Sequence, residues 1–199
     1  GVSLPEAFLL TLRGYWRGRY PGRQPHFIAR VRAGHAAFAA ESGQDFQDRV
    51  RDLRARLGRD GFSDALLAEA FAIVSIASSR ALGITPYDTQ LIAARIMLDN
   101  RLAEMATGEG KTLAAAIAAA SAALAGVPVH VVTANDYLVE RDALNLLPLY
   151  RALGLSVGAV LPHMDVAARK AAYACDIAYC TARELVFDYL RDGLGRDLD

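Results

Sequence analysis

Apolar residues recur at helical spacing through most of this chain, and four short stretches have the continuous apolar character of buried strands. The predicted helices cover residues 4–15, 45–57, 63–81, 85–98, 110–125, 136–153, 165–174 and 181–191. The predicted strands cover residues 101–105, 127–133, 155–161 and 175–180. Strands that alternate with helices of this length need crossover connections and therefore form a parallel sheet. We predict an α/β fold in which helices flank a parallel sheet and a helical segment precedes it.

Residues that favour helix ends stand at most of these boundaries. The predicted N-caps are Ser63, Thr85, Asn135 or Asp136, Asp165 and Thr181. Gly83 is placed to close the helix that Ser63 begins, and Pro86 to occupy the first turn of the next helix. Glu184, three residues after Thr181, is expected to complete a capping box.

The composition is that of a folded chain, with 53% hydrophobic residues, 22% charged residues and a formal net charge of zero. A neutral chain has no global field that attracts nucleic acid, so we expect no nucleic-acid partner. Cys175 and Cys180 are spaced neither as a redox pair nor as half of a usual zinc site, and we interpret them as buried free thiols. No apolar run reaches the roughly 18–20 residues that cross a bilayer, and the N-terminus has no secretory signal. These features predict a cytoplasmic protein.

The chain changes character near residue 62, and we predict two parts, residues 1–62 and residues 63–199. The first part is helical and partly basic: residues 1–35 hold six arginines against one acid, Glu6, together with several aromatic residues. This basic segment either docks on an anionic surface or packs its arginine stems on the domain with the guanidinium groups in water. The pattern alone leaves both interpretations open.

A glycine-rich loop at residues 105–112, Met-Ala-Thr-Gly-Glu-Gly-Lys-Thr, leads into a predicted alanine-rich helix. It matches the phosphate-binding pattern G-x-x-x-x-G-K-[ST] except at Met105, its first position. Glycines in such a loop let backbone N–H groups turn toward phosphates, lysine contacts the outer phosphates, and the hydroxyl binds Mg²⁺. Only two of the 22 basic residues are lysines, and one of them, Lys111, stands in this loop. The alternative is a glycine-rich turn with a surface lysine. The strand–loop–helix setting favours a site for ATP and Mg²⁺.

A second motif places Gln90 in the first turn of a predicted helix, where its amide can pair with an adenine edge. An exposed glutamine on a helix surface is the ordinary alternative. Four motifs in order are more specific than either feature alone. They are residues 86–91, 103–112, 131–143 and 187–192. Together they resemble the opening of the SecA preprotein translocase ATPase family, over about residues 63–192.

The resemblance implies a RecA-like first nucleotide-binding domain of a superfamily 2 motor, incomplete within residues 63–199. It implies that Gln90 reads adenine, that Lys111 contacts the outer phosphates and that Thr112 binds Mg²⁺. The nucleotide-binding residues that it implies are Tyr87, Gln90, Thr107, Gly108, Glu109, Gly110, Lys111 and Thr112.

The resemblance also implies partners and a location. These are preprotein substrates, a SecYEG-type channel and the inner face of the cell membrane, where residues 1–35 would meet anionic lipid. Arg141 and Asp142 would belong to a coupling surface between domains, or they form an exposed ion pair on a helix.

The chain departs from the family pattern at two places. Thr85 stands where Arg or His is usual, and Cys180, Ala182 and Arg183 stand where Gly and Asn-Asn are usual. No apolar run in the sequence ends in Asp-Glu, the carboxylate pair that holds Mg²⁺ and orients the attacking water. We therefore expect this chain alone to bind nucleotide with negligible turnover. The alternatives are a truncated binding or interaction module without catalysis, and a fragment of a nucleic-acid helicase.

Overall fold

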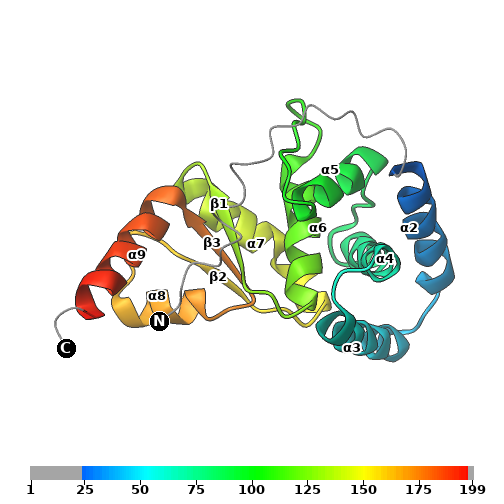
Figure 1. Ribbon diagram of the computed structural model, residues 1–199, viewed down its shortest axis with the longest axis horizontal. Coiled ribbons are helices and arrows are strands. Elements are labelled where there is room, and N and C mark those ends of the chain that lie inside the picture. The colour runs from blue at the N-terminus through cyan, green and yellow to red at the C-terminus, as the bar shows by residue number, and fades with distance from the viewer. Residues whose placement is uncertain (1–23, 197–199) are drawn as a thin grey trace.

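The structure, a computed structural model, describes residues 24–196, with backbone only from residue 193 onward. The helices are α2 (Gln24–Phe38), α3 (Gly43–Asp60), α4 (Asp64–Leu82), α5 (Asp88–Leu98), α6 (Lys111–Leu124), α7 (Asp136–Ala152), α8 (Val166–Tyr173) and α9 (Ala182–Arg196). The strands are β1 (Val129–Thr133), β2 (Val157–Ala159) and β3 (Ile177–Thr181). Helices α2 to α6 form one end of the molecule, and the sheet with α8 and α9 forms the other (Figure 1). The mixed α/β class predicted from the sequence is confirmed.

The sheet is parallel, as predicted, with the strand order β1-β3-β2. All five residues of β3 are buried because β3 lies between its two neighbours. The carboxylate of Asp176, just before β3, accepts hydrogen bonds from the N–H (2.7 Å) and the hydroxyl (2.6 Å) of Ser156. This contact joins the amino ends of β2 and β3 and helps to set their register.

The strand predicted over residues 101–105 is wrong. These residues carry no strand structure, and Leu102 is 93% exposed. A strand is defined by hydrogen bonds to a neighbouring strand, and within residues 24–196 no such neighbour pairs with this segment. The apolar pattern therefore indicated an extended segment but could not supply its partner.

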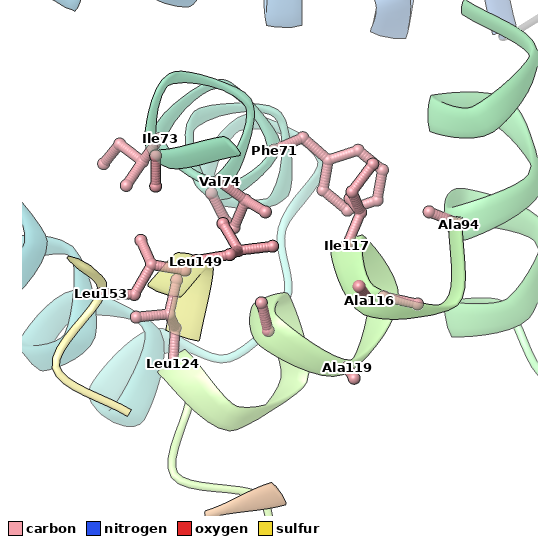
Figure 2. Packing of buried hydrophobic residues seen from close by; sticks show 14 of the residues in the cluster. Phe71, Ile73, Val74, Ala94, Ala116, Ile117, Ala119, Leu124, Leu149 and Leu153 are labelled. Atoms are coloured by element: carbon pink, nitrogen blue, oxygen red, sulfur yellow. The ribbon is translucent and has the colours of Figure 1, made fainter. Parts of the chain in front are cut away.

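The core centres on α4, which packs against α2, α6 and α7. Figure 2 shows Phe71 and Val74 of α4 facing Ile117 of α6 and Leu149 of α7. The many alanines of α6 leave little side chain on its surface, so neighbouring helices approach it closely. Among the described residues, α4 alone is long and apolar enough to cross a membrane, but 61% of its apolar window is buried inside the protein. Its burial against three other helices identifies it as a core helix.

Helix ends largely follow the sequence. The hydroxyl of Ser63 accepts the N–H of Leu66 (3.2 Å), and Gly83 closes α4 in the left-handed conformation at φ +70°. Asn135 caps α7 and Asp165 caps α8. These predictions are confirmed. Residues 45–57, predicted as a helix, lie within α3, which buries Phe46, Val50, Leu53 and Leu57 on one face.

The start of α5 was predicted wrongly, since Tyr87 and not Thr85 is its N-cap. The hydroxyl of Thr85 pairs with that of Ser79 at 2.9 Å, and the helix begins only at Asp88. Pro86 therefore precedes the helix instead of standing in its first turn. Helix α2 was not predicted at all, and the helix predicted near residues 4–15 lies outside the described residues. The boundary predicted at residue 62 falls between α3 and α4, and it remains a prediction.

Candidate functional site

The glycine-rich loop lies directly ahead of α6, the helix that begins at Lys111. Gly108 and Gly110 have φ of +88° and +78°, backbone conformations that favour glycine. Gly110 is the N-cap of α6, and the first backbone N–H groups of any α-helix have no acceptor within the helix. Thr107 and Thr112 are exposed on the same segment. The loop therefore presents backbone donors, an ammonium group and hydroxyl groups beside one another, the donor set for an anion.

Two side chains of the loop close it on Ala106. The ammonium of Lys111 donates to the carbonyl oxygen of Ala106 at 2.8 Å. The carboxylate of Glu109 accepts the N–H of the same residue, also at 2.8 Å. Both polar groups of Ala106 are thus bonded within the loop, and one of the three N–H donors of Lys111 is already used.

Gln90 connects the loop to α5. Its side-chain oxygen accepts the N–H of Tyr87 (2.9 Å), and its amide nitrogen donates to the carbonyl of Glu109 (3.1 Å). Gln90 is buried, whereas Tyr87 is 73% exposed. A Cβ on Gly110 would lie 2.1 Å from the Gln90 amide nitrogen, so the glutamine occupies the space beside this glycine. The structure therefore brings Tyr87, Gln90 and the loop together as one site, and a role of Gln90 at adenine remains a prediction.

At the carboxyl edge of the sheet, Arg183 donates to the carboxylate of Asp136 at 3.4 Å. This contact links the first turns of α7 and α9, at a position where the sequence departs from the family pattern. Both partners are substantially exposed, so the ion pair adds little stability. Arg141 pairs with its neighbour Asp142 at 2.6 Å, and Asp142 is buried, so this pair is not fully exposed. A role of Arg141 and Asp142 in coupling between domains remains a prediction.

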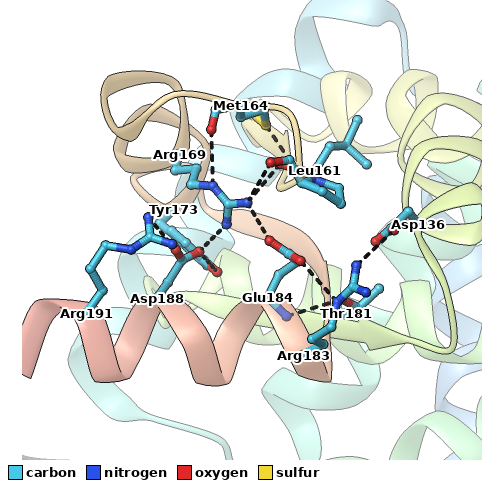
Figure 3. Close-up of polar contacts among 11 residues, drawn as sticks. Asp136, Leu161, Met164, Arg169, Tyr173, Thr181, Arg183, Glu184, Asp188 and Arg191 are labelled. Atoms are coloured by element: carbon cyan, nitrogen blue, oxygen red, sulfur yellow. Dashed lines mark hydrogen bonds and ion pairs between the residues drawn. The ribbon is translucent and has the colours of Figure 1, made fainter.

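The sequence interpretation missed a buried ionic cluster around Arg169 of α8 (Figure 3). The guanidinium of Arg169 donates to the carboxylate of Glu184 and, at 2.6 Å, to that of Asp188. Asp188 also accepts the hydroxyl of Tyr173 at 3.0 Å. Further donors of Arg169 reach the carbonyl oxygens of Leu161, Pro162 and Met164 at 3.1, 3.4 and 3.4 Å. One side chain therefore ties α8, α9 and the loop after β2 together.

The cluster has two consequences for its residues. Burial alone would lower the pKa of Arg169, but its hydrogen bonds to Glu184 and Asp188 outweigh burial and raise the pKa above its ordinary value. The predicted capping box at Thr181 is only half present in the described structure. The hydroxyl of Thr181 accepts the N–H of Glu184 (3.3 Å), while the Glu184 carboxylate turns to Arg169 and Arg183. The box was a wrong prediction because the cluster takes the carboxylate.

The phosphate-type loop, the helix that follows it and the parallel sheet define the class of protein as an α/β domain of the P-loop type. The model of one family, described as the SecA DEAD-like domain, matches residues 19–199. The chain therefore belongs to the SecA family.

Individual relatives agree with this assignment. The chain is 48% identical over 172 residues to the protein translocase subunit SecA of Nitrosococcus oceani, which covers 86% of this chain and 19% of the relative. It is 45% identical over 163 residues to SecA 2 of Nitrosospira multiformis, covering 82% of this chain and 24% of the relative. With SecA 2 of Bordetella avium it shares 48% identity over 182 residues, or 89% of this chain and 28% of the relative. The chain thus spans between about a fifth and somewhat over a quarter of the length of these relatives.

Proposed function

We propose that this chain binds ATP with Mg²⁺ at residues 105–112, as the nucleotide-binding part of a SecA-type motor. The observation that carries the proposal is the geometry of the loop. Gly108 and Gly110 are in the left-handed conformation immediately ahead of α6, and Lys111 is the first residue of that helix. SecA family membership supports the same ligand class.

The residues present fit a magnesium nucleotide. Lys111 would donate to an oxygen of the outer phosphates, beside or in place of its bond to the carbonyl of Ala106, and the exposed Thr112 hydroxyl would be a ligand for Mg²⁺. The ring of Tyr87, largely exposed beside Gln90, offers an aromatic face to the base. Bound Mg²⁺ would neutralise part of the phosphate charge.

For the whole protein we propose a motor that couples ATP hydrolysis to movement of preproteins through a SecYEG-type channel, from the cytoplasmic face of the membrane. For this chain by itself we propose binding with negligible turnover. Its 199 residues contain no apolar run that ends in Asp-Glu, and phosphoryl transfer depends on such carboxylates for positioning. Binding without turnover is also what a nucleotide-binding module without catalysis would give. Hydrolysis by the full-length protein, or its absence, separates the motor from that alternative.

The test of binding is titration calorimetry of Mg-ADP and Mg-ATP into the chain and into two matched variants. The sequence has two lysines, Lys111 in the loop and the exposed Lys170 on α8. Lys111→Ala should abolish measurable binding because the phosphate contact is lost, while Lys170→Ala should bind like the unchanged protein. Equal binding by all three proteins would show that the nucleotide binds elsewhere, and no binding by the unchanged protein would reject the proposal.

A membrane contact through residues 1–35 is a separate proposal, which rests on the six arginines of that segment. The measurement is sedimentation with vesicles of anionic lipid and with vesicles of neutral lipid. The chain should pellet with the anionic vesicles only, and deletion of residues 1–20 should reduce this. Unchanged binding after the deletion would remove the membrane contact from the proposal.

A further inference from the structure

Arg32 of α2 contacts the segment that leads into α5, more than fifty residues away in the sequence. Its Nε and Nη2 atoms donate to one carboxylate oxygen of Asp88 at 3.1 and 2.6 Å. Nη2 also donates to the carbonyl oxygen of Pro86 at 3.3 Å. The planar guanidinium group therefore holds the first residue of α5 and the backbone two residues before it. Both charged side chains are about half exposed, so this ion pair contributes little to stability, and its effect is on position.

The segment held by Arg32 is the one that carries Tyr87 and Gln90. Gln90 accepts the N–H of Tyr87 and donates to the carbonyl of Glu109 in the phosphate-type loop. Because Gly110 has no Cβ, the Gln90 amide fits directly beside it, and this fixes the position of the glutamine relative to the loop. An unbroken series of contacts thus runs from α2 through the start of α5 to the loop.

Helix α2 is a fixed support for this series. The ring of Phe27 packs edge-on against Phe71 of α4, with ring centroids 5.2 Å apart. The guanidinium of Arg95, on α5, lies 5.0 Å from the centre of the Phe27 ring and pairs with Asp64 of α4 at 2.8 Å. Helix α2 therefore contacts α5 both at Asp88 and at Arg95, about two turns further on, and Figure 1 shows α2, α4 and α5 gathered at the same end of the molecule.

We infer that Arg32 is a positioning residue for the base of the nucleotide, so that α2 sets the preference of the site for an adenine nucleotide over a bare polyphosphate. The inference rests on the proposed function. A polyphosphate needs only the loop of residues 105–112, whereas the base also needs Tyr87 and Gln90 at a fixed distance from the loop. Removing the guanidinium group frees the start of α5 and leaves Lys111 and Thr112 in place.

The experiment measures the affinity of the whole chain for Mg-ADP and for Mg-tripolyphosphate, which has no base. Arg32→Ala should weaken ADP about fivefold to tenfold, equivalent to roughly 1–1.4 kcal/mol, and change tripolyphosphate less than about twofold. Arg32→Lys keeps the charge but cannot hold both acceptors, so its ADP affinity should be intermediate. Arg30→Ala, an exposed arginine of the same helix, is the matched control and should leave both affinities unchanged.

Two further measurements separate positioning from a general effect on folding. In the Asp88→Ala background, Arg32→Ala should add little, because the main partner of the guanidinium is already gone. Without any nucleotide, amide hydrogen exchange should rise at residues 87–91 in Arg32→Ala, while the midpoint of urea unfolding stays unchanged.

The inference is overturned if ADP and tripolyphosphate weaken equally, if ADP affinity does not change, or if exchange at residues 87–91 is unaltered. Failure of the proposed function looks different. In that case neither probe binds the unchanged chain, or both still bind after Lys111→Ala.

Discussion

Replacing Arg169 by Met tests whether the cluster in Figure 3 holds the sheet end of the molecule together. The side chain of Arg169 is 7% exposed, and those of its partners Glu184 and Asp188 are 9% and 13% exposed. Met has similar length and no charge, so the variant leaves the two buried carboxylates with only Arg183 (3.3 Å) and Arg191 (3.4 Å), both more than half exposed, as counter-ions. Breaking a buried ion pair from one side costs about 3–5 kcal/mol. A domain of this size has a total stability of about 5–15 kcal/mol, so the loss is a large fraction of it.

The assay is urea unfolding followed by far-ultraviolet circular dichroism at pH 7, with the slope m compared between proteins. Arg51→Ala is the matched control. Arg51 pairs with Asp48, but both side chains are more than half exposed, so its loss should cost about 0–1 kcal/mol. Adding Glu184→Gln to Arg169→Met should recover part of the lost stability, since it removes one of the two buried carboxylate charges that lost their contact with Arg169.

Neutral substitutions of the carboxylates distinguish unbalanced charge from lost packing. Adding both Glu184→Gln and Asp188→Asn to Arg169→Met removes both carboxylate charges, so stability at pH 7 should recover further than with Glu184→Gln alone. A loss below about 1 kcal/mol at pH 7 would refute the reasoning. A larger loss that neither carboxylate substitution reduces would assign the effect to packing instead.

Three other substitutions or measurements probe separate features. Burial alone would raise the pKa of Asp176, but the hydrogen bonds from Ser156 hold this pKa below its ordinary value. The Asp176 carboxylate therefore stabilises the fold above about pH 4, and this stabilisation is lost as the pH falls through the pKa of the folded state. Asp176→Asn should therefore cost about 1 kcal/mol at pH 7 in urea unfolding, a difference that shrinks between pH 5 and pH 3, and a constant difference would contradict this. Burial raises the pKa of the Cys180 thiol to about 11, so iodoacetamide at pH 8 should label the partly exposed Cys175 in native protein and Cys180 only after unfolding, as read by peptide mass. Gly158→Ala should lower unfolding stability by about 1–3 kcal/mol, because a Cβ there would lie 2.4 Å from a backbone oxygen of α8, and an unchanged urea midpoint would show that α8 can shift.

Helices and their ends were predictable because their signals are local. Ser63 and Gly83 mark the two ends of α4 by the conformations that their own side chains favour, and the spacing of apolar residues between them marks its buried faces. The start of α5 shows the limit of this reasoning. Thr85 has the chemistry of an N-cap, but its hydroxyl bonds to Ser79 and the helix starts later.

Features that depend on distant partners were not predictable from one sequence. The residues 101–105 have strand character but no strand beside them in the described part of the chain. Arg169 draws its acceptors from an earlier loop and from a helix 15 to 19 residues later, and Arg32 draws its acceptors from 54 and 56 residues away. No spacing rule joins such positions, whereas the loop of residues 105–112 was found because all its functional groups are consecutive.

The bond between Lys111 and Ala106 occupies one of the three N–H donors that this ammonium group could offer to a ligand. An anion therefore meets two further donors on this group, or it replaces the carbonyl oxygen that lies 2.8 Å from the Lys111 nitrogen. Charged acceptors form bonds about twice as strong as neutral ones, so the exchange is favourable for phosphate but small for any single contact. A small anion that makes one or two bonds gains little from it, whereas a polyphosphate that engages several backbone donors together gains from all of them. A phosphate site at this loop would therefore select anions by the number of bonds that they can form at once.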